Sequence, residues 1–398
     1  MRAGEDPGAS MTTTPAVAAH RTTGVRRAVA IAWGVVALLL AVGCSGPAPQ
    51  PEPSASSVDW QALGAAVETA IQGDTSGLDN IRAVLVSVDG KTQLEHYRDG
   101  FSADDHEHVW SVTKSVVATL IGIAIDDGLI PSVDQPLSVL LPEHHKAMSP
   151  TVSRVTLRQL MSMSGGFAEE DWSLVLYERD KSDGDDFIDY LLKLGPRHEP
   201  GTSFEYSNTS AHLAAAVLAS ALARSNDPPK QTLLDYARAN LFEPLGIRTE
   251  PGYTGNITLP VPEAFANAGF GWLTDPTNLP YGGFGLRLTP TDMIKIGELY
   301  RNDGLWQGTQ IIPGAWVQQV LEPSTLNQEY GLLWWIATGP DTTPAYGAVG
   351  AYGQAIWVWP SRHAVLVCLT ASPPDADHNL NIEPILVDVI ATALTRLS

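Results

Sequence analysis

Residues 110–125 read WSVTKSVVATLIGIAI, and this stretch decides how the chain is interpreted. Between Ser111 and Ile125 the only charged residue is Lys114. A helix that is apolar on nearly all sides is normally buried, and an unpaired ammonium near its start is costly to bury. The positive end of the helix dipole also disfavours a cation there. Both effects predict a lowered pKa for Lys114, so that its amine can accept a proton.

Ser111 lies three residues before Lys114, so one helical turn places both side chains on the same face. A serine hydroxyl becomes a strong nucleophile when a neighbouring base takes its proton. Free N–H groups at a helix N-terminus can also bind a developing oxyanion. The alternative is that Ser111 only caps the helix and that Lys114 extends towards solvent. Lys114 is the only one of the seven lysines that completes a Ser-x-x-Lys pattern.

A second pattern, Tyr206-x-Asn208, precedes a helix that is expected to begin near Ala211. A tyrosine hydroxyl near a lysine can relay a proton to a leaving group. Asn208 can donate to a substrate carbonyl and accept a hydrogen bond from Lys114. Residues 300–302 repeat the Tyr-x-Asn pattern, but they end a helical run and are expected to form a helix C-terminus followed by a turn.

The two ends of the chain predict one antiparallel sheet. Strand-like runs over 81–88 and 91–97 flank Asp89-Gly90, which is a strong hairpin signal. Two further runs, 354–359 and 364–370, flank a second turn. We therefore expect a sheet that is built from both chain ends and flanked by helices.

The middle of the chain alternates helix-like segments with loops rich in Pro and Gly and offers few strand-like runs. The predicted fold class is α/β (α+β), with a mainly helical domain inserted between two halves of one antiparallel sheet. The α/β part is expected over 58–105 and 286–398, and the helical part over 106–285. The clearest further helices are expected over 211–223, 232–241 and 379–397.

The first 57 residues are predicted to be a targeting segment and a tether. Arg26 and Arg27 precede an uncharged run over 28–43, which suits a signal peptide and is short for a membrane span. The run ends at Cys44 and there resembles a bacterial lipobox, so residues 1–44 are expected to be a signal peptide whose cysteine is lipidated. Residues 45–57 are rich in Pro, Ser and Ala and are expected to form a tether. We expect an exported lipoprotein on the cell surface, with secretion after cleavage of an ordinary signal peptide as the alternative; Met11 is a second candidate start.

Other site types receive little support from the sequence. The net charge of −20 argues against a nucleic-acid partner. Cys368, the other cysteine, lies in an apolar run and is expected to be an inert buried thiol. The histidines in 106–108 and 144–145 lack the i, i+4 metal spacing and are expected on surface loops. No cofactor and no metal ion are expected.

Several motifs together resemble the class C β-lactamases and the related penicillin-recognising hydrolases, esterases and 6-aminohexanoate-dimer hydrolases. The resemblance covers residues 59–398 and includes, in order, Ser111-x-x-Lys114, the segment 160–166, Pro200-Gly201 before Tyr206-x-Asn208, and the segment 283–292. It implies a hydrolase domain over 58–398 with Ser111, Lys114 and Tyr206 as catalytic residues.

The third motif departs from this family. Its β-lactamases and DD-peptidases have Lys-Thr-Gly or His-Thr-Gly on the strand beside the nucleophile, whereas this chain has Ala348-Val349-Gly350. No cation is available there to hold a substrate carboxylate. Gly350 still permits close approach, and the N–H of Ala351 is expected to be the second oxyanion donor.

The resemblance therefore implies a serine hydrolase acting on a small ester or amide through an acyl-enzyme. A β-lactamase or DD-peptidase is the first alternative, and a catalytically silent binding lipoprotein of the same fold is the second. Trp172, which closely follows the 164–166 turn, is the best candidate for an aromatic residue in the substrate cleft. Trp334, Trp335, Trp357 and Trp359 are expected to pack in the core, with a place in the lining of a substrate cleft as the alternative.

Overall fold

The structure is a computed structural model that describes residues 58–73, 78–98, 100–167, 186–225, 231–258, 261–372 and 389–397. Every described residue belongs to one compact unit within residues 53–398. None of the described helices combines the length and the apolar composition that crossing a bilayer requires.

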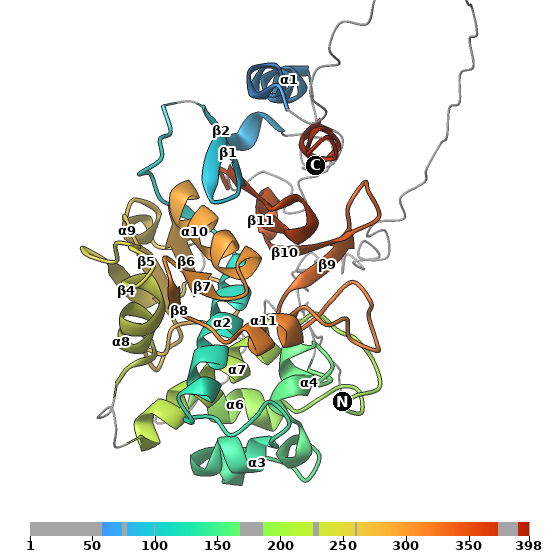
Figure 1. Ribbon diagram of the computed structural model, residues 1–398. Coiled ribbons are helices and arrows are strands. Elements are labelled where there is room, and N and C mark those ends of the chain that lie inside the picture. Colours follow the sequence, from blue (N-terminus) through green and yellow to red (C-terminus); the bar gives the residue numbers. More distant parts are fainter. Residues whose placement is uncertain are drawn as a thin grey trace, which may run out of the picture. The chain divides into compact units, whose positions relative to one another are not determined.

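The main sheet has the strand order β2-β1-β12-β11-β10-β9, and all neighbouring strands are antiparallel (Figure 1). Strands β1 and β12 come from opposite ends of the chain, and Val84 lies opposite Cys368 in their register. At the hairpin between β1 and β2, Asp89 and Gly90 both have positive φ, as a tight two-residue turn requires. The predicted fold class, with its sheet built from both chain ends, is confirmed. The strands are β1 (Ile81–Val88), β2 (Lys91–Tyr97), β9 (Trp335–Thr338), β10 (Pro344–Gly350), β11 (Gln354–Trp359) and β12 (Ala364–Thr370).

Both faces of this sheet are covered, which explains why β1 is apolar at almost every position. Ala83 and Leu85 face a large core that also contains residues of the helices over 112–126 and 208–224. Val84 and Val86 belong to a smaller core on the other face of the sheet. The first and last described helices, α1 and α12, contribute to the smaller core (Figure 1). The predicted C-terminal helix over 379–397 is described only from residue 389, as a π-helical turn followed by α12.

The segment predicted to be mainly helical contributes three strands to a second sheet with strand order β3-β6-β5-β4, and the fourth strand, β6, begins just after this segment. Its strands are only two to four residues long, which is too short for a periodic sequence pattern. They are β3 (Glu107–His108), β4 (Tyr253–Asn256), β5 (Gly271–Thr274) and β6 (Leu286–Leu288), and a separate pair is formed by β7 (Leu305–Trp306) and β8 (Thr309–Gln310).

The described α-helices are α1 (Trp60–Gly73), α2 (Val112–Asp126), α3 (Leu137–Leu140), α4 (Leu157–Met161), α6 (Phe187–Leu194), α7 (Asn208–Arg224), α8 (Leu233–Ala237), α9 (Glu263–Ala266), α10 (Pro290–Arg301), α11 (Gly314–Val320) and α12 (Thr392–Leu394). Short 3-10 segments are η2 (Leu78–Asn80), η3 (Pro142–Ala147), η4 (Val152–Arg154), η6 (Ala351–Gly353) and η7 (Pro360–Arg362), and η5 (Arg238–Phe242) is a π-helical turn.

Helix α2 lies at the centre of the described fold. It is buried from Val112 to Ala124, as its apolar composition predicts, and it packs against α7, β10 and β11. Gly122 allows α11 to approach closely, because a Cβ there would lie 2.2 Å from the ring of Trp316. The Trp316 indole also donates a hydrogen bond to the carbonyl of Ala118. These contacts fix the position of the helix whose N-terminus carries Ser111.

Candidate active site

Ser111 is the N-cap of α2 and is reached from β3 through a tightly held turn. Trp110, directly before it, has a positive φ of 49°, which is uncommon for a bulky residue. The indole of Trp110 donates to the Ser372 hydroxyl at 2.9 Å, and its ring stacks on His108. The Ser111 hydroxyl makes no capping hydrogen bond to the helix. The Ser111 side chain therefore does not cap the helix, which argues against the alternative in which capping is its only role.

Lys114 is buried, with 1% of the residue exposed, and its ammonium position is surrounded by three oxygen atoms. Its Nζ lies 2.8 Å from Ser111 Oγ, 2.6 Å from Asn208 Oδ1 and 2.7 Å from the carbonyl oxygen of Gly283. These three partners come from the start of α2, the start of α7 and the loop before β6. The alternative in which Lys114 extends into solvent is excluded by this burial.

Tyr206 brings an aromatic ring to the same amine. Lys114 Nζ lies 4.8 Å from the centre of the Tyr206 ring, and this ring stacks on Trp335 with centroids 5.7 Å apart. Tyr330 contacts Tyr206 edge to face. Burial, and then the neighbouring phenol of Tyr206, hold the pKa of Tyr330 well above its usual value, so Tyr330 remains a neutral phenol.

Helix α7 begins earlier than the sequence predicted, at Asn208 rather than near Ala211. The reason is local: Ser207 is in extended conformation and its hydroxyl accepts from the N–H of Ser210, so it serves as the N-cap. Asn208 thus lies in the first helical turn, where the backbone fixes the direction of its side chain towards Lys114.

The end of β10 lies directly against the Ser111 turn. A Cβ on Gly350 would lie 2.4 Å from the carbonyl oxygen of Val109 and 3.0 Å from the backbone nitrogen of Ser111, so only glycine fits. Ala351 follows at the start of the 3-10 turn after β10. Among the turn and loop hydrogen bonds of the described residues, none is donated by the backbone N–H of Ser111. The Ala351 amide follows Gly350 at the strand end that touches the Ser111 turn.

Two of the predicted site residues, Trp172 and Cys44, lie outside the described residues. Two contributors to the site, Gly283 and Tyr330, were not singled out from the sequence. Gly283 supplies a backbone carbonyl, which no side-chain pattern reveals, although it opens the quoted 283–292 motif. Tyr330 and Trp335 contact the Tyr206 ring. Of the two adjacent tryptophans, Trp334 is fully buried in the core, whereas Trp335 is partly buried and stacks on Tyr206.

The expectation of surface histidines was wrong for His108. It lies on β3, is buried, and accepts a hydrogen bond from the N–H of Gly285. Burial, and then the charge of Arg287, lower the pKa of His108 to about 3. Residues 106–108 are all polar in sequence, so they gave no sign that His108 is buried. Its burial comes from tertiary contacts around the two-residue strand β3.

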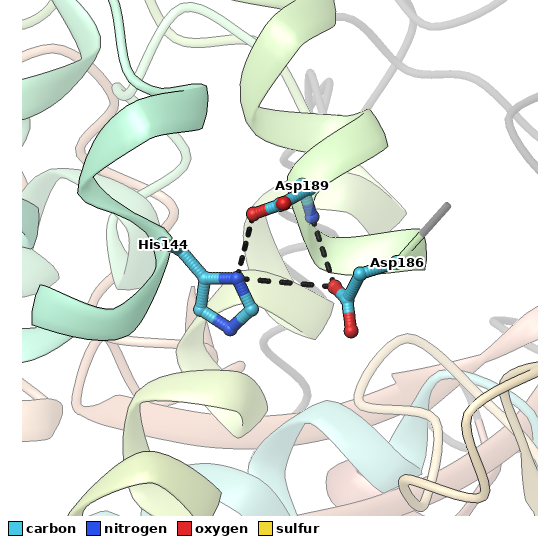
Figure 2. Close-up of side chains that lie close together, drawn as sticks. All are labelled: His144, Asp186 and Asp189. Carbon is cyan, nitrogen blue, oxygen red and sulfur yellow. Dashed lines mark hydrogen bonds and ion pairs between the residues drawn. The ribbon is translucent and has the colours of Figure 1, made fainter. Parts of the chain in front are cut away.

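His144 lies beside Asp186 and Asp189, as Figure 2 shows, and these three side chains are close enough together to be considered as metal ligands. Hydrogen bonds within the group explain its arrangement. Asp186 is the N-cap of α6 and accepts from the N–H groups of Ile188 and Asp189, and His144 Nδ1 lies 2.7 Å from Asp189 Oδ1. The cluster thus links η3 to the start of α6.

Comparison with known proteins agrees with this architecture. The family model described as Beta-lactamase matches residues 72–388. A 6-aminohexanoate-dimer hydrolase of Paenarthrobacter ureafaciens is 24% identical over 331 residues, which cover 77% of each protein.

Solved structures of the same fold include a family VIII carboxylesterase, with a TM-score of 0.62, 17% identity and coverage of 87% of this chain and 99% of that one. A penicillin-binding protein homologue from Caulobacter crescentus has a TM-score of 0.60 at 18% identity, with coverage of 84% and 98%. Because the family model spans most of the sequence, and the fold is shared with hydrolases of this type, the chain belongs to the beta-lactamase family of hydrolases.

Proposed function

We propose that this protein is a serine hydrolase that cleaves a small ester or amide through an acyl-enzyme on Ser111. The observation that carries the proposal is the distance of 2.8 Å between Lys114 Nζ and Ser111 Oγ at a buried helix start. A nucleophile within hydrogen-bonding reach of a base is the arrangement that covalent catalysis requires.

The surroundings of Lys114 support its role as the base. Burial disfavours the charged ammonium. A neutral amine has two hydrogens, and Asn208 Oδ1 and the Gly283 carbonyl are placed to accept both. The lone pair of the nitrogen then faces the hydroxyl of Ser111.

In the first half of the reaction, Ser111 Oγ bonds to the substrate carbonyl carbon while its proton passes to Lys114. The carbonyl electron pair moves to the oxygen, which accepts hydrogen bonds from the amides of Ser111 and Ala351. When the tetrahedral intermediate collapses, the bond to the alcohol or amine breaks. Tyr206 protonates this leaving group and recovers its proton from Lys114.

In the second half, water attacks the acyl-enzyme and gives its proton to the same groups. Collapse releases the carboxylic acid and returns the proton to Ser111 Oγ. The enzyme is restored without any external reactant other than water.

The composition of β10 favours substrates that need no cationic partner. Residues 344–350 contain no Lys, Arg or His that could hold a substrate carboxylate. The alternative, a β-lactamase or DD-peptidase, is favoured by the similarity to the penicillin-binding protein homologue. It predicts saturable acylation by penicillins, which the composition of β10 opposes. The second alternative is a silent binding lipoprotein, for which no serine would be activated.

A fluorophosphonate tests the proposal, because it labels only activated serines. We expect a single adduct on Ser111 by peptide mass spectrometry, together with hydrolysis of a short p-nitrophenyl ester. Ser111→Ala should lose both while keeping its circular dichroism spectrum. Ser115→Ala is the matched control: it lies on the same helix, but its hydroxyl donates to the Leu333 carbonyl, so labelling should persist. An unlabelled wild-type protein would refute the proposal.

We further propose that the protein is exported and held at the membrane surface by a lipid on Cys44. The proposal rests on the sequence of residues 26–57 alone. Mass spectrometry of the mature N-terminus, with a Cys44→Ser variant, tests it: a cleaved chain without lipid would indicate secretion instead.

A further inference from the structure

A fully buried histidine–aspartate pair lies behind Lys114. His212 is one helical turn after Asn208 on α7, and Asp275 directly follows β5. Both side chains are 0% exposed, and His212 Nε2 lies 3.0 Å from Asp275 Oδ2. The mechanism above does not use either residue.

The hydrogen bonds of His212 define its tautomer. The backbone N–H of Gly282 donates to His212 Nδ1 at 3.2 Å, so Nδ1 carries no proton. Nε2 therefore carries the proton and donates it to Asp275. The rings of Tyr281 and Phe187 lie against the imidazole, with the Tyr281 centroid 4.4 Å away.

Asp275 is held as a carboxylate by several donors. Burial raises its pKa, but hydrogen bonds from His212, Thr277 and the N–H of Leu279 outweigh this effect, and the pKa lies below its usual value. Asp275 Oδ1 accepts from the Thr277 N–H at 2.8 Å and from the Leu279 N–H at 3.0 Å. The carboxylate thereby fixes the turn that leads towards Gly282.

The loop that His212 holds is the one that contacts Lys114. A Cβ on Gly282 would lie 2.5 Å from the carbonyl of Ala211, and a Cβ on Gly283 would lie 2.8 Å from Asn208 Oδ1. The loop thus packs directly on the first turns of α7. The next backbone carbonyl, that of Gly283, accepts from Lys114 Nζ.

We propose that His212 and Asp275 are positioning residues that hold Gly282 on α7 and so place the Gly283 carbonyl that orients the Lys114 amine. This inference rests on the proposed function, because it concerns the base of that reaction. Among the described residues, the groups that face Lys114 Nζ include Ser111, Tyr206, Asn208 and the Gly283 carbonyl.

The test variant, Asp275→Asn, removes the carboxylate of Asp275 and keeps the size and shape of the side chain. In Asp275→Asn, the amide oxygen can still accept from Thr277 and Leu279, but the NH₂ group faces His212 Nε2. The imidazole then changes tautomer, as expected when an aspartate that orients a histidine becomes asparagine. Nδ1 then carries the proton, so it can no longer accept from the Gly282 N–H. The two N–H groups face each other and repel, which displaces the loop.

We expect Asp275→Asn to lower kcat for a p-nitrophenyl ester by about 10²-fold, which is the cost of misplacing a catalytic group by about 1 Å. KM should change little. Since an ammonium loses one acceptor when the Gly283 carbonyl moves away, the acidic limb of the kcat/KM profile should shift to lower pH. A residue with only a structural role would not shift this limb.

Ser220→Ala is the matched control. It removes a buried hydrogen bond on the same helix, from Ser220 Oγ to the Leu140 carbonyl, and should lower the melting temperature without changing kcat or the pH profile. His212→Gln is the second variant. It keeps a donor for Asp275 but removes the acceptor for Gly282, so it should behave like Asp275→Asn.

The outcomes separate the two proposals. A wild-type protein that a fluorophosphonate does not label refutes the proposed function itself. If the wild type is labelled on Ser111 but folded Asp275→Asn or His212→Gln has the kcat and pH profile of Ser220→Ala, the positioning role is overturned.

Discussion

Replacing Gly350 with alanine tests whether the backbone of β10 is part of the catalytic machinery. At this position φ is −123°, which alanine adopts without strain, so any effect comes from the added methyl group alone. That methyl group would lie 2.4 Å from the Val109 carbonyl, whereas ordinary contacts begin at 3.4 Å. The strand or the Ser111 turn must therefore move by about 3.4 − 2.4 = 1.0 Å.

A displacement of this size separates the two amides that are proposed to bind the oxyanion. Losing one oxyanion donor typically costs 10²–10³ in kcat, or about 2.7–4 kcal/mol of transition-state stabilisation. We expect a loss in this range for Gly350→Ala, measured as kcat with a p-nitrophenyl ester. Substrate binding should suffer less, because the donors act mainly on the charge that develops in the transition state.

The control for Gly350→Ala must add a methyl group elsewhere in the core. In Gly297→Ala, the Cβ would lie 2.3 Å from Val365 Cγ1, between α10 and the main sheet. Overpacking of this kind costs about 1–3 kcal/mol of stability, but kcat of the folded protein should remain that of the wild type. If Gly350→Ala melts like the wild type and keeps its kcat, the assignment of the β10 backbone to the oxyanion site is refuted.

Three further predictions follow from the contacts. Lys114→Ala and Tyr206→Phe should each lower kcat by about 10²-fold or more through lost proton transfer; unchanged steady-state kinetics for Tyr206→Phe would remove this residue from the mechanism. Arg301→Leu should cost about 3–5 kcal/mol in urea unfolding, because it leaves the buried Glu298 carboxylate, 2.6 Å from Arg301 Nε, without its cation; a midpoint like that of the wild type would contradict this. Because the pKa of His108 is lowered to about 3 in the folded state, the unfolded chain binds the extra proton below about pH 6.5, and stability should fall by about 1.4 kcal/mol per pH unit as the pH decreases from there towards 3. Urea titrations at several pH values measure this slope, which should disappear in His108→Gln and would be absent from the wild type if His108 were accessible to solvent.

The sequence predicted the main sheet well because its strands are long and its turns are explicit. The run over 81–88 is buried on both faces, and Asp89-Gly90 supplies the two positive φ angles of the turn. The second sheet could not be predicted, because strands such as β3 contain two residues and depend on tertiary contacts. The same limit explains His108, whose burial comes from packing around Phe265 and Trp110 rather than from its neighbours in sequence.

The candidate active site also has parts that the sequence predicted and parts that it did not. Ser111 and Lys114 could be placed together from helical spacing alone, and the Tyr206-x-Asn208 pattern gained its support from the family resemblance. What spacing could not predict is the contribution of backbone atoms, such as the Gly283 carbonyl on Lys114. It also could not predict which of two adjacent tryptophans faces the site: Trp334 is fully buried, whereas Trp335 stacks on Tyr206.

The third motif of this chain keeps one task of the strand and loses another. The strand keeps the glycine backbone beside the Ser111 turn, and it loses the cation that holds a substrate carboxylate in the relatives with Lys-Thr-Gly or His-Thr-Gly. On β10, the requirement for glycine at position 350 comes from the backbone of the Ser111 turn, which any acyl transfer at this serine shares. The residue two positions earlier, Ala348, is fully buried in the large core and carries no charge. Replacing a cation by Ala348 therefore leaves the proposed oxyanion site intact while removing a partner for anionic substrates. Because position 348 is buried, Ala348→Lys should lower the melting temperature by placing an unpaired ammonium in the core, and it should not create a preference for substrates with a carboxylate. Parallel measurements of kcat/KM with a neutral ester and with a carboxylate-bearing ester test this, and a selective gain for the carboxylate-bearing ester would refute it.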